Sequence, residues 1–126
     1  MRLPRAAAIV AACVLSAAGC SKPRYIDTMV RNESGAELRT VEVDYPGGSF
    51  GTTRIAAGAS FHYRFKPLHT GGTKLLYSEG GKELTFAGPD LKESVGGTMQ
   101  IVVRTPTSPQ RVAWTYAATD TPQQSR

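Results

Sequence analysis

Short runs of alternating apolar and polar residues make up most of the chain from Tyr25 onward. The clearest is 61–66, where three aromatic residues alternate with His62, Arg64 and a lysine. Successive side chains of a β-strand point to opposite faces, so this run predicts a strand with one aromatic and one basic face. No run repeats apolar residues at helical spacing, and we expect no helix in this part of the chain.

The other runs of this kind are bounded by Gly, Pro, Asn or Asp, which favour turns. The expected strands are 26–31, 40–45, 49–55, 61–66, 75–77, 84–86, 99–104 and 112–116. The turn residues 32–35 predict a hairpin between the first two strands. Phe50 and Ile55 fall on opposite faces of a regular strand, so we expect a bulge at Gly51 that brings both rows to one side.

Short strands at intervals of about 8 to 12 residues favour a two-sheet sandwich or a small barrel. We predict an all-β, immunoglobulin-like antiparallel β-sandwich of seven or eight strands over residues 25–116, with a small β-barrel as the alternative. Residues 117–126 are expected to form a flexible C-terminal tail. The expected core comprises Val30, Val41, Val43, Tyr63, Phe65, Leu75, Leu84, Phe86, Ile101, Val103 and Trp114.

The first 19 residues have the pattern of an export signal. Arg2 and Arg5 give a basic start, and the uncharged run 6–18 follows. A run of this length is too short for a membrane-spanning helix, which needs about 20 apolar residues. We therefore predict that residues 1–19 are a signal peptide that is removed on export.

The last residues before the mature chain, Ala17-Ala18-Gly19-Cys20, resemble the lipobox of bacterial lipoproteins, in which small residues precede an obligatory cysteine. That family prefers Leu three positions before the cysteine and tolerates Ala, which this chain has. The resemblance implies that Cys20 receives a diacylglycerol, becomes the first mature residue and is acylated on its amino group. Two or three acyl chains would anchor the domain lastingly, where one would not.

The alternative is an ordinary cut after Ala18, with Ser16 and Ala18 as the small-residue pair, which would release a soluble secreted protein. In the lipoprotein family, an Asp after the cysteine retains the protein in the inner membrane. This chain has Ser21, which favours the outer membrane, with the domain facing the periplasm. Residues 20–24 would then be the lipidated cysteine and a short tether.

A second, looser resemblance covers residues 32–66, which are similar to bacterial lipoproteins without assigned activity. The similarity lies in Ser34-Gly35, in the Asp-Tyr-Pro-Gly-Gly segment 44–48 and in the aromatic–basic run 61–66. It supports the architecture and implies no chemistry.

Charge and cysteine content limit the function classes. Removal of Arg2 and Arg5 lowers the net charge from +5 to +3, and the remaining basic residues are scattered, so we expect no nucleic-acid partner. The only cysteines are Cys13, which leaves with the signal peptide, and Cys20. The mature domain therefore has no cysteine pair for a disulfide and no thiolate metal site, and no cofactor is predicted.

The best candidate for a surface site is the set His62, Arg64, Glu42 and Asp44. A histidine beside a carboxylate can act as a general base, provided that Glu42 or Asp44 shares its sheet surface. Cross-strand ion pairs on a solvated face are the favoured interpretation of the same residues. Two histidines, His62 and a His69 expected in a loop, are a weak signal for a metal site, and neither a metal site nor a catalytic residue is predicted.

The sequence thus favours a non-catalytic envelope lipoprotein that acts as a membrane-anchored interaction or structural module, with an envelope protein or polysaccharide as partner. One alternative is a small hydrolase or metal-dependent enzyme that uses His62 with Glu42 or Asp44. A third hypothesis is a protein that binds polysaccharide or another small ligand on exposed aromatic rings. Tyr25, Phe50 and Tyr77 are the rings that an edge strand would expose, although filling the core is their more common role.

Overall fold

The computed structural model describes residues 24–119, and every regular element in this range is a β-strand. The predicted signal peptide, Cys20 and residues 120–126 lie outside the described residues. All eight predicted runs form strands, and the last continues past the expected end at Tyr116 to Thr119. The strands are β1 Ile26–Asn32, β2 Leu38–Tyr45, β3 Gly48–Ile55, β4 Ser60–Phe65, β5 Lys74–Glu79, β6 Lys82–Ala87, β7 Gly96–Val103 and β8 Val112–Thr119.

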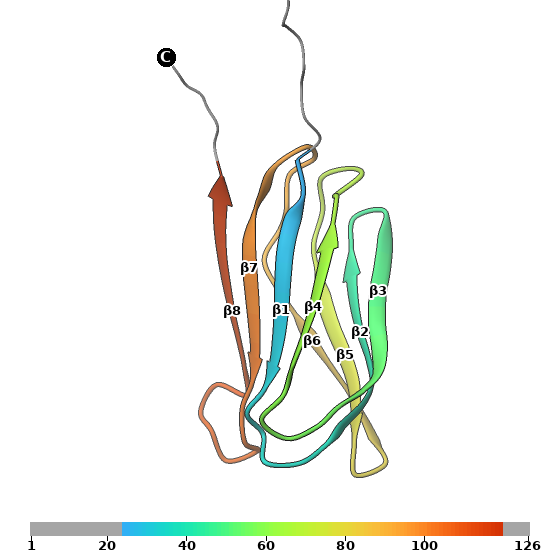
Figure 1. Ribbon diagram of the computed structural model, residues 1–126, viewed down its shortest axis with the longest axis vertical. Helices are drawn as coiled ribbons and strands as arrows, with labels where there is room; N and C mark the ends of the chain where they lie inside the picture. Colours follow the sequence, from blue (N-terminus) through green and yellow to red (C-terminus); the bar gives the residue numbers. More distant parts are fainter. Residues whose placement is uncertain (1–23, 120–126) are drawn as a thin grey trace, which may run out of the picture.

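The strands form two four-stranded sheets that pack face to face (Figure 1). Sheet A has the order β4-β1-β7-β8 and sheet B the order β3-β2-β5-β6. The predicted β-sandwich is therefore confirmed, and residues 24–119 do not form the alternative closed barrel. Five strand pairs are antiparallel, but β1 and β7 run parallel, with Ile26 opposite Gly97. The prediction of a purely antiparallel sandwich is wrong for this pair, because strands this far apart in sequence are not restricted to hairpin geometry.

The predicted hairpin between β1 and β2 is also wrong. β1 belongs to sheet A and β2 to sheet B, so residues 33–37 carry the chain from one sheet to the other. The cause is the last residue of β1, Asn32, which is fully buried and donates a hydrogen bond from Nδ2 to the carbonyl oxygen of Ile55, 2.9 Å away. This long-range bond binds the turn to the end of β3, and a local turn signal does not contain that information.

The core lies between the two sheets and follows the predicted alternation. Tyr63 is the exception, because its side chain is 46% exposed where the sequence predicts burial. The other expected members are buried, apart from Leu84, Phe86 and Trp114, which pack partly buried against the cluster. The buried hydrophobic residues are Ile26, Val30, Leu38, Val41, Val43, Phe50, Ile55, Phe65, Leu75, Tyr77, Leu91, Met99, Ile101, Val103 and Val112.

An irregularity in β2 and β3 brings Phe50 and Ile55 both into the core, as expected, but it is centred on Thr40 and not on Gly51. Thr40 has φ 50°, a left-handed conformation that is rare for a β-branched residue, and the register between β2 and β5 shifts beside it. Gly51 is required for a different reason, because a Cβ there would overlap the carbonyl oxygen of Val41.

The sandwich has two distinct ends. We call the end where the described chain begins the entry end; it holds Tyr25 and the connections 46–47, 66–73 and 88–95. The far end holds the connections 33–37, 56–59, 80–81 and 104–111. β8 also finishes at the entry end, so both limits of the described chain lie there (Figure 1).

Candidate functional site

His62 and Arg64 lie on β4, one of the two edge strands of sheet A, and both side chains are exposed. Arg64 Nε donates to Asp27 Oδ1 on the paired strand β1 at 2.9 Å, and its guanidinium lies over the ring of Tyr25 at 5.6 Å. The hydrogen bond with Asp27 raises the pKa of Arg64, which is charged at physiological pH in any case. This arrangement is a solvated cross-strand ion pair.

Glu42 and Asp44 lie on β2, in the interior of sheet B, and point away from the core. The neighbouring Asp44 raises the pKa of Glu42, first through a hydrogen bond between the two carboxyl groups and then through charge repulsion, whereas Ser49 and Lys74 oppose this shift. Asp44 Oδ1 is buried without a hydrogen-bond partner among the described residues. Asp44 thus destabilises the charged form of Glu42 on the outer face of sheet B.

The structure does not bring the histidine and the carboxylates together. His62 is on the outer face of sheet A and Glu42 is on the outer face of sheet B, so the expectation that they share a sheet surface is wrong. The chain changes sheets between β1 and β2 and again between β3 and β4, which alternation along the strands cannot reveal. No general base with a carboxylate partner is assembled from these residues.

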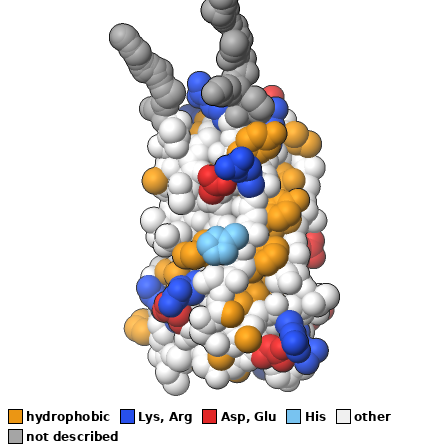
Figure 2. All heavy atoms as spheres, in the orientation of Figure 1, with side chains coloured by type: hydrophobic (Ala, Val, Ile, Leu, Met, Phe, Trp, Pro, Cys, Tyr) orange, Lys and Arg blue, Asp and Glu red, His pale blue; other side chains and the backbone are white. Residues whose placement is uncertain are grey.

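Aromatic rings gather instead between the edge strands β3 and β4. The Phe65 ring centroid lies 4.2 Å from that of Tyr45 and 5.4 Å from that of Phe50. Tyr63 stacks on Phe50 at 4.4 Å with an interplanar angle of 15°, and Phe61 lies near both. Figure 2 shows a band of hydrophobic side chains on this side of the molecule. The exposed ring of Tyr63 therefore rests on a buried one.

The aromatic candidates for an exposed edge divide between surface and core. Tyr25 is 41% exposed, whereas Phe50 and Tyr77 are buried at 6% and 2%. Tyr77 stacks against Phe86 at 5.8 Å, and burial raises the pKa of its hydroxyl group. Sequence reasoning missed Tyr63, since its position in the alternation indicates the core; only its place on an edge strand leaves it exposed.

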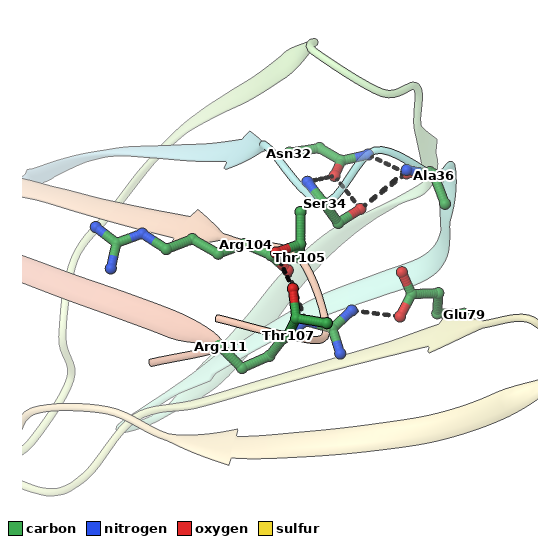
Figure 3. A network of polar contacts seen from close by, with 8 residues as sticks. All are labelled: Asn32, Ser34, Ala36, Glu79, Arg104, Thr105, Thr107 and Arg111. Atoms are coloured by element: carbon green, nitrogen blue, oxygen red, sulfur yellow. Dashed lines mark hydrogen bonds and ion pairs between the residues drawn. The ribbon is translucent and has the colours of Figure 1, made fainter. Parts of the chain in front are cut away.

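A polar network at the far end was not predicted (Figure 3). The Asn32 side chain donates to the carbonyl oxygens of Ala36 and Ile55 at 2.7 and 2.9 Å, and its Oδ1 accepts from the amide and hydroxyl groups of Ser34 at 3.0 and 2.6 Å. Every hydrogen-bonding atom of this side chain is therefore used. The Asn-Glu-Ser-Gly sequence gives only the turn signal, and that signal does not specify burial.

An ion pair closes the same end between the two sheets. Arg111, which precedes β8, pairs with Glu79 at the end of β5, and the two side chains are only 18% and 16% exposed. Arg111 Nε also donates to the carbonyl oxygen of Arg104 at 2.6 Å, and its guanidinium lies 6.0 Å from the ring centre of Tyr77. These contacts are structural, since they join sheet A to sheet B.

Comparisons of the chain with protein-family models, with curated proteins and with solved structures found no match. Within residues 24–119 no three His, Cys, Asp or Glu side chains are grouped so as to hold a metal ion, and His69 lies in the β4–β5 connection as expected. In the same range no helix is long and apolar enough to cross a membrane.

Proposed function

We propose that the protein is a non-catalytic envelope lipoprotein that holds a β-sandwich beside a lipid leaflet as an interaction or structural module. The observation that carries the proposal is the lipobox-like sequence ending at Cys20, only six residues before Ile26, the first residue of β1. The proposed lipid on Cys20 provides the membrane attachment. Ser21 favours the outer membrane, with the domain in the periplasm.

The placement of the candidate side chains supports a non-catalytic role over the hydrolase or metal-enzyme alternative. His62 stands on sheet A and Glu42 and Asp44 on sheet B, so the pair that a general base would need is divided between opposite faces of the sandwich. Arg64 is already paired with Asp27. The edge strands β3 and β4 and the exposed ring of Tyr63 are the features through which the domain would contact a partner.

Replacement of the two cysteines tests the anchor with a matched control. Cys20→Ala should abolish acylation and leave unprocessed precursor or soluble protein, whereas Cys13→Ala, within the predicted signal peptide, should be processed and membrane-bound as usual. Globomycin, which blocks lipoprotein signal peptidase, should cause the precursor of the unsubstituted chain to accumulate. A mature amino end without acyl groups in mass spectrometry, or unchanged processing together with unchanged membrane partition of Cys20→Ala, would defeat the proposal.

Cross-linking in intact envelopes, followed by purification of the lipoprotein, then seeks the partner. Cys20→Ala provides the control in this experiment, because a partner met only at the membrane should be lost with the anchor. Recovery of the same partner by the soluble form would indicate recognition by the domain alone.

A second candidate function, polysaccharide binding, is favoured by Tyr63. The residue is 46% exposed, and its ring lies nearly parallel to that of Phe50 on the edge strand β4. A fixed aromatic ring offers an apolar face to a sugar, and the backbone groups at the open edge of β4 offer hydrogen bonds. Glycan-array binding that disappears in Tyr63→Ala and persists in Tyr25→Ala would support this role; equal binding by the two variants would exclude it.

A further inference from the structure

Two of the three large hydrophobic side chains exposed in residues 24–119 lie at the entry end. Tyr25 is 41% exposed and Leu68 is 57% exposed. Ile26 pairs with Phe65 across β1 and β4, so Tyr25 and the segment that begins at Lys66 emerge side by side. The entry end therefore presents two exposed apolar side chains, which we call the apolar pair, and Tyr25 adjoins the point where the chain arrives from Cys20.

Leu68 is held in this exposed position by its backbone. Its amide donates to the carbonyl oxygen of Pro46 at 2.9 Å, and its side chain lies against Gly47, where an added Cβ would be 2.5 Å from that of Leu68. Gly47 has φ 102°, so this close approach uses a conformation that glycine adopts readily. A leucine fixed outward in this way adds no burial to the core.

Charged groups are arranged differently at the two ends. Four of the five ion pairs in residues 24–119 lie at or beside the far end, and the fifth is Arg64 with Asp27. The entry end has exposed Arg24 and Lys66 beside Tyr25, while Lys92, Asp90 and Glu93 lie on the β6–β7 connection. The local charge is nearly balanced, so an anionic partner has no strong electrostatic advantage here, and the apolar pair must supply the contact.

The length of chain before Tyr25 limits how far this end can stand from a lipid anchor. Tyr25 is the fifth residue after Cys20, and fully extended chain spans at most about 3.6 Å per residue, or about 18 Å in all. Tyrosine is favoured at membrane interfaces because its ring is apolar and its hydroxyl is polar, and flanking Lys and Arg side chains reach the headgroups. The residues at the entry end match that environment.

We propose that the entry end is a lipid-facing surface, in which Tyr25 and Leu68 enter the headgroup region of the leaflet and Arg24 and Lys66 contact the headgroups. This inference rests on the proposed acylation of Cys20. It gives the anchored domain a fixed orientation: strands of up to eight residues at about 3.3 Å per residue hold the far end about 26 Å away from the lipid. The far-end connections and the β3–β4 edge then remain available to a partner.

The test uses the mature lipoprotein, purified from bacterial membranes and reconstituted into vesicles of phosphatidylethanolamine and phosphatidylglycerol. Single fluorophores are attached at Leu68→Cys or His69→Cys at the entry end, and, as the matched control, at Lys82→Cys at the far end, where β6 begins. Lipids with a nitroxide headgroup serve as quencher. We expect several-fold stronger quenching at positions 68 and 69 than at position 82, and the same contrast in vesicles of phosphatidylcholine alone.

The possible failures can be told apart, because the mature amino-terminal peptide is analysed by mass spectrometry in each sample. Absence of acyl groups would overturn both the anchor and the orientation. Acylated protein with equal quenching at the two ends would overturn only the lipid-facing surface. The fluorophore at position 68 could instead stay shielded from solvent in detergent, and more so at higher protein concentration. That result would show that a second copy covers the entry end, and the inference would fail.

A double variant adds a measurement in which the label replaces neither member of the apolar pair. Tyr25→Ser with Leu68→Ser should leave the melting temperature nearly unchanged, since both side chains are exposed, but should weaken headgroup quenching of a fluorophore at Thr70→Cys several-fold. Unchanged quenching at this position would contradict the role of the apolar pair.

Discussion

At the entry end of the sandwich, aromatic rings fill the space between the sheets, whereas at the far end a hydrogen-bonded asparagine and an ion pair do so. Phe65 and Tyr45 meet at 4.2 Å at the first, and Asn32 makes four hydrogen bonds at the second. Apolar filling tolerates small shifts because dispersion and burial are not directional, while a buried amide must meet each partner closely. The geometry of the far end is thus more tightly determined than that of the entry end. The entry end can carry exposed apolar groups.

Phe65→Ala, at the entry end, should cause the largest loss of stability. Phe65 is 3% exposed and lies within the aromatic cluster, so truncation leaves a cavity between β3 and β4 and should cost about 3 to 5 kcal/mol of unfolding free energy. Denaturant unfolding measures the loss, and Phe65→Leu, which keeps most of the volume, should lose much less. Coincident unfolding curves for Phe65→Ala and the unsubstituted domain would show that the ring is not part of the core.

Asn32→Ala tests the far end in the same assay. The substitution removes four hydrogen bonds and strands the buried carbonyl oxygen of Ile55, so it should cost about 2 to 4 kcal/mol. Asn32→Asp should be comparably destabilising, because it keeps the shape but replaces the two N–H donors with a buried carboxylate. A loss below about 1 kcal/mol would mean that water replaces the amide without cost.

These two positions illustrate how far sequence reasoning reaches. Alternation predicts all eight strands and places Phe65 in the core, because it is a local property of successive residues. It misplaces the 32–35 turn, since the bond from Asn32 to Ile55 joins residues 23 positions apart. It likewise cannot separate His62 from Glu42, because the order of strands within sheets depends on contacts between distant segments.

Substitutions in the Arg111–Glu79 pair test whether the stability of the far end depends on charge. Both side chains are mostly buried, so Glu79→Gln should cost about 1 to 3 kcal/mol by leaving a partly buried guanidinium without its counter-ion. Leu in place of Glu79 together with Met in place of Arg111 should recover much of the loss. The exposed pair Arg31–Glu33 is the control, and its removal should cost less than about 1 kcal/mol. Equal losses of unfolding free energy for the two pairs would show that burial of the Arg111–Glu79 pair does not increase its contribution to stability.

The smallest effect concerns Glu42, which lies on the surface between the two ends. A carboxyl group whose pKa is raised in the folded state is harder to ionise there than in the unfolded chain, so its ionisation lowers stability as pH rises above its ordinary value near 4.5. Glu42→Gln should therefore gain stability at pH 7 and gain nothing at pH 3. The gain should be about 0.2 to 0.5 kcal/mol, because solvent screens the repulsion from Asp44.

Glu83→Gln is the matched control, since Glu83 is an exposed glutamate of β6 in the same sheet. It should give no gain at pH 7 in thermal or denaturant unfolding. If Glu42→Gln stabilised the domain equally at pH 3 and pH 7, the gain would come from the amide itself. Stability that fell at pH 7 would show that Glu42 is held by Ser49 and Lys74 more strongly than Asp44 repels it, and the two carboxylates would then be part of the sandwich's stabilising contacts.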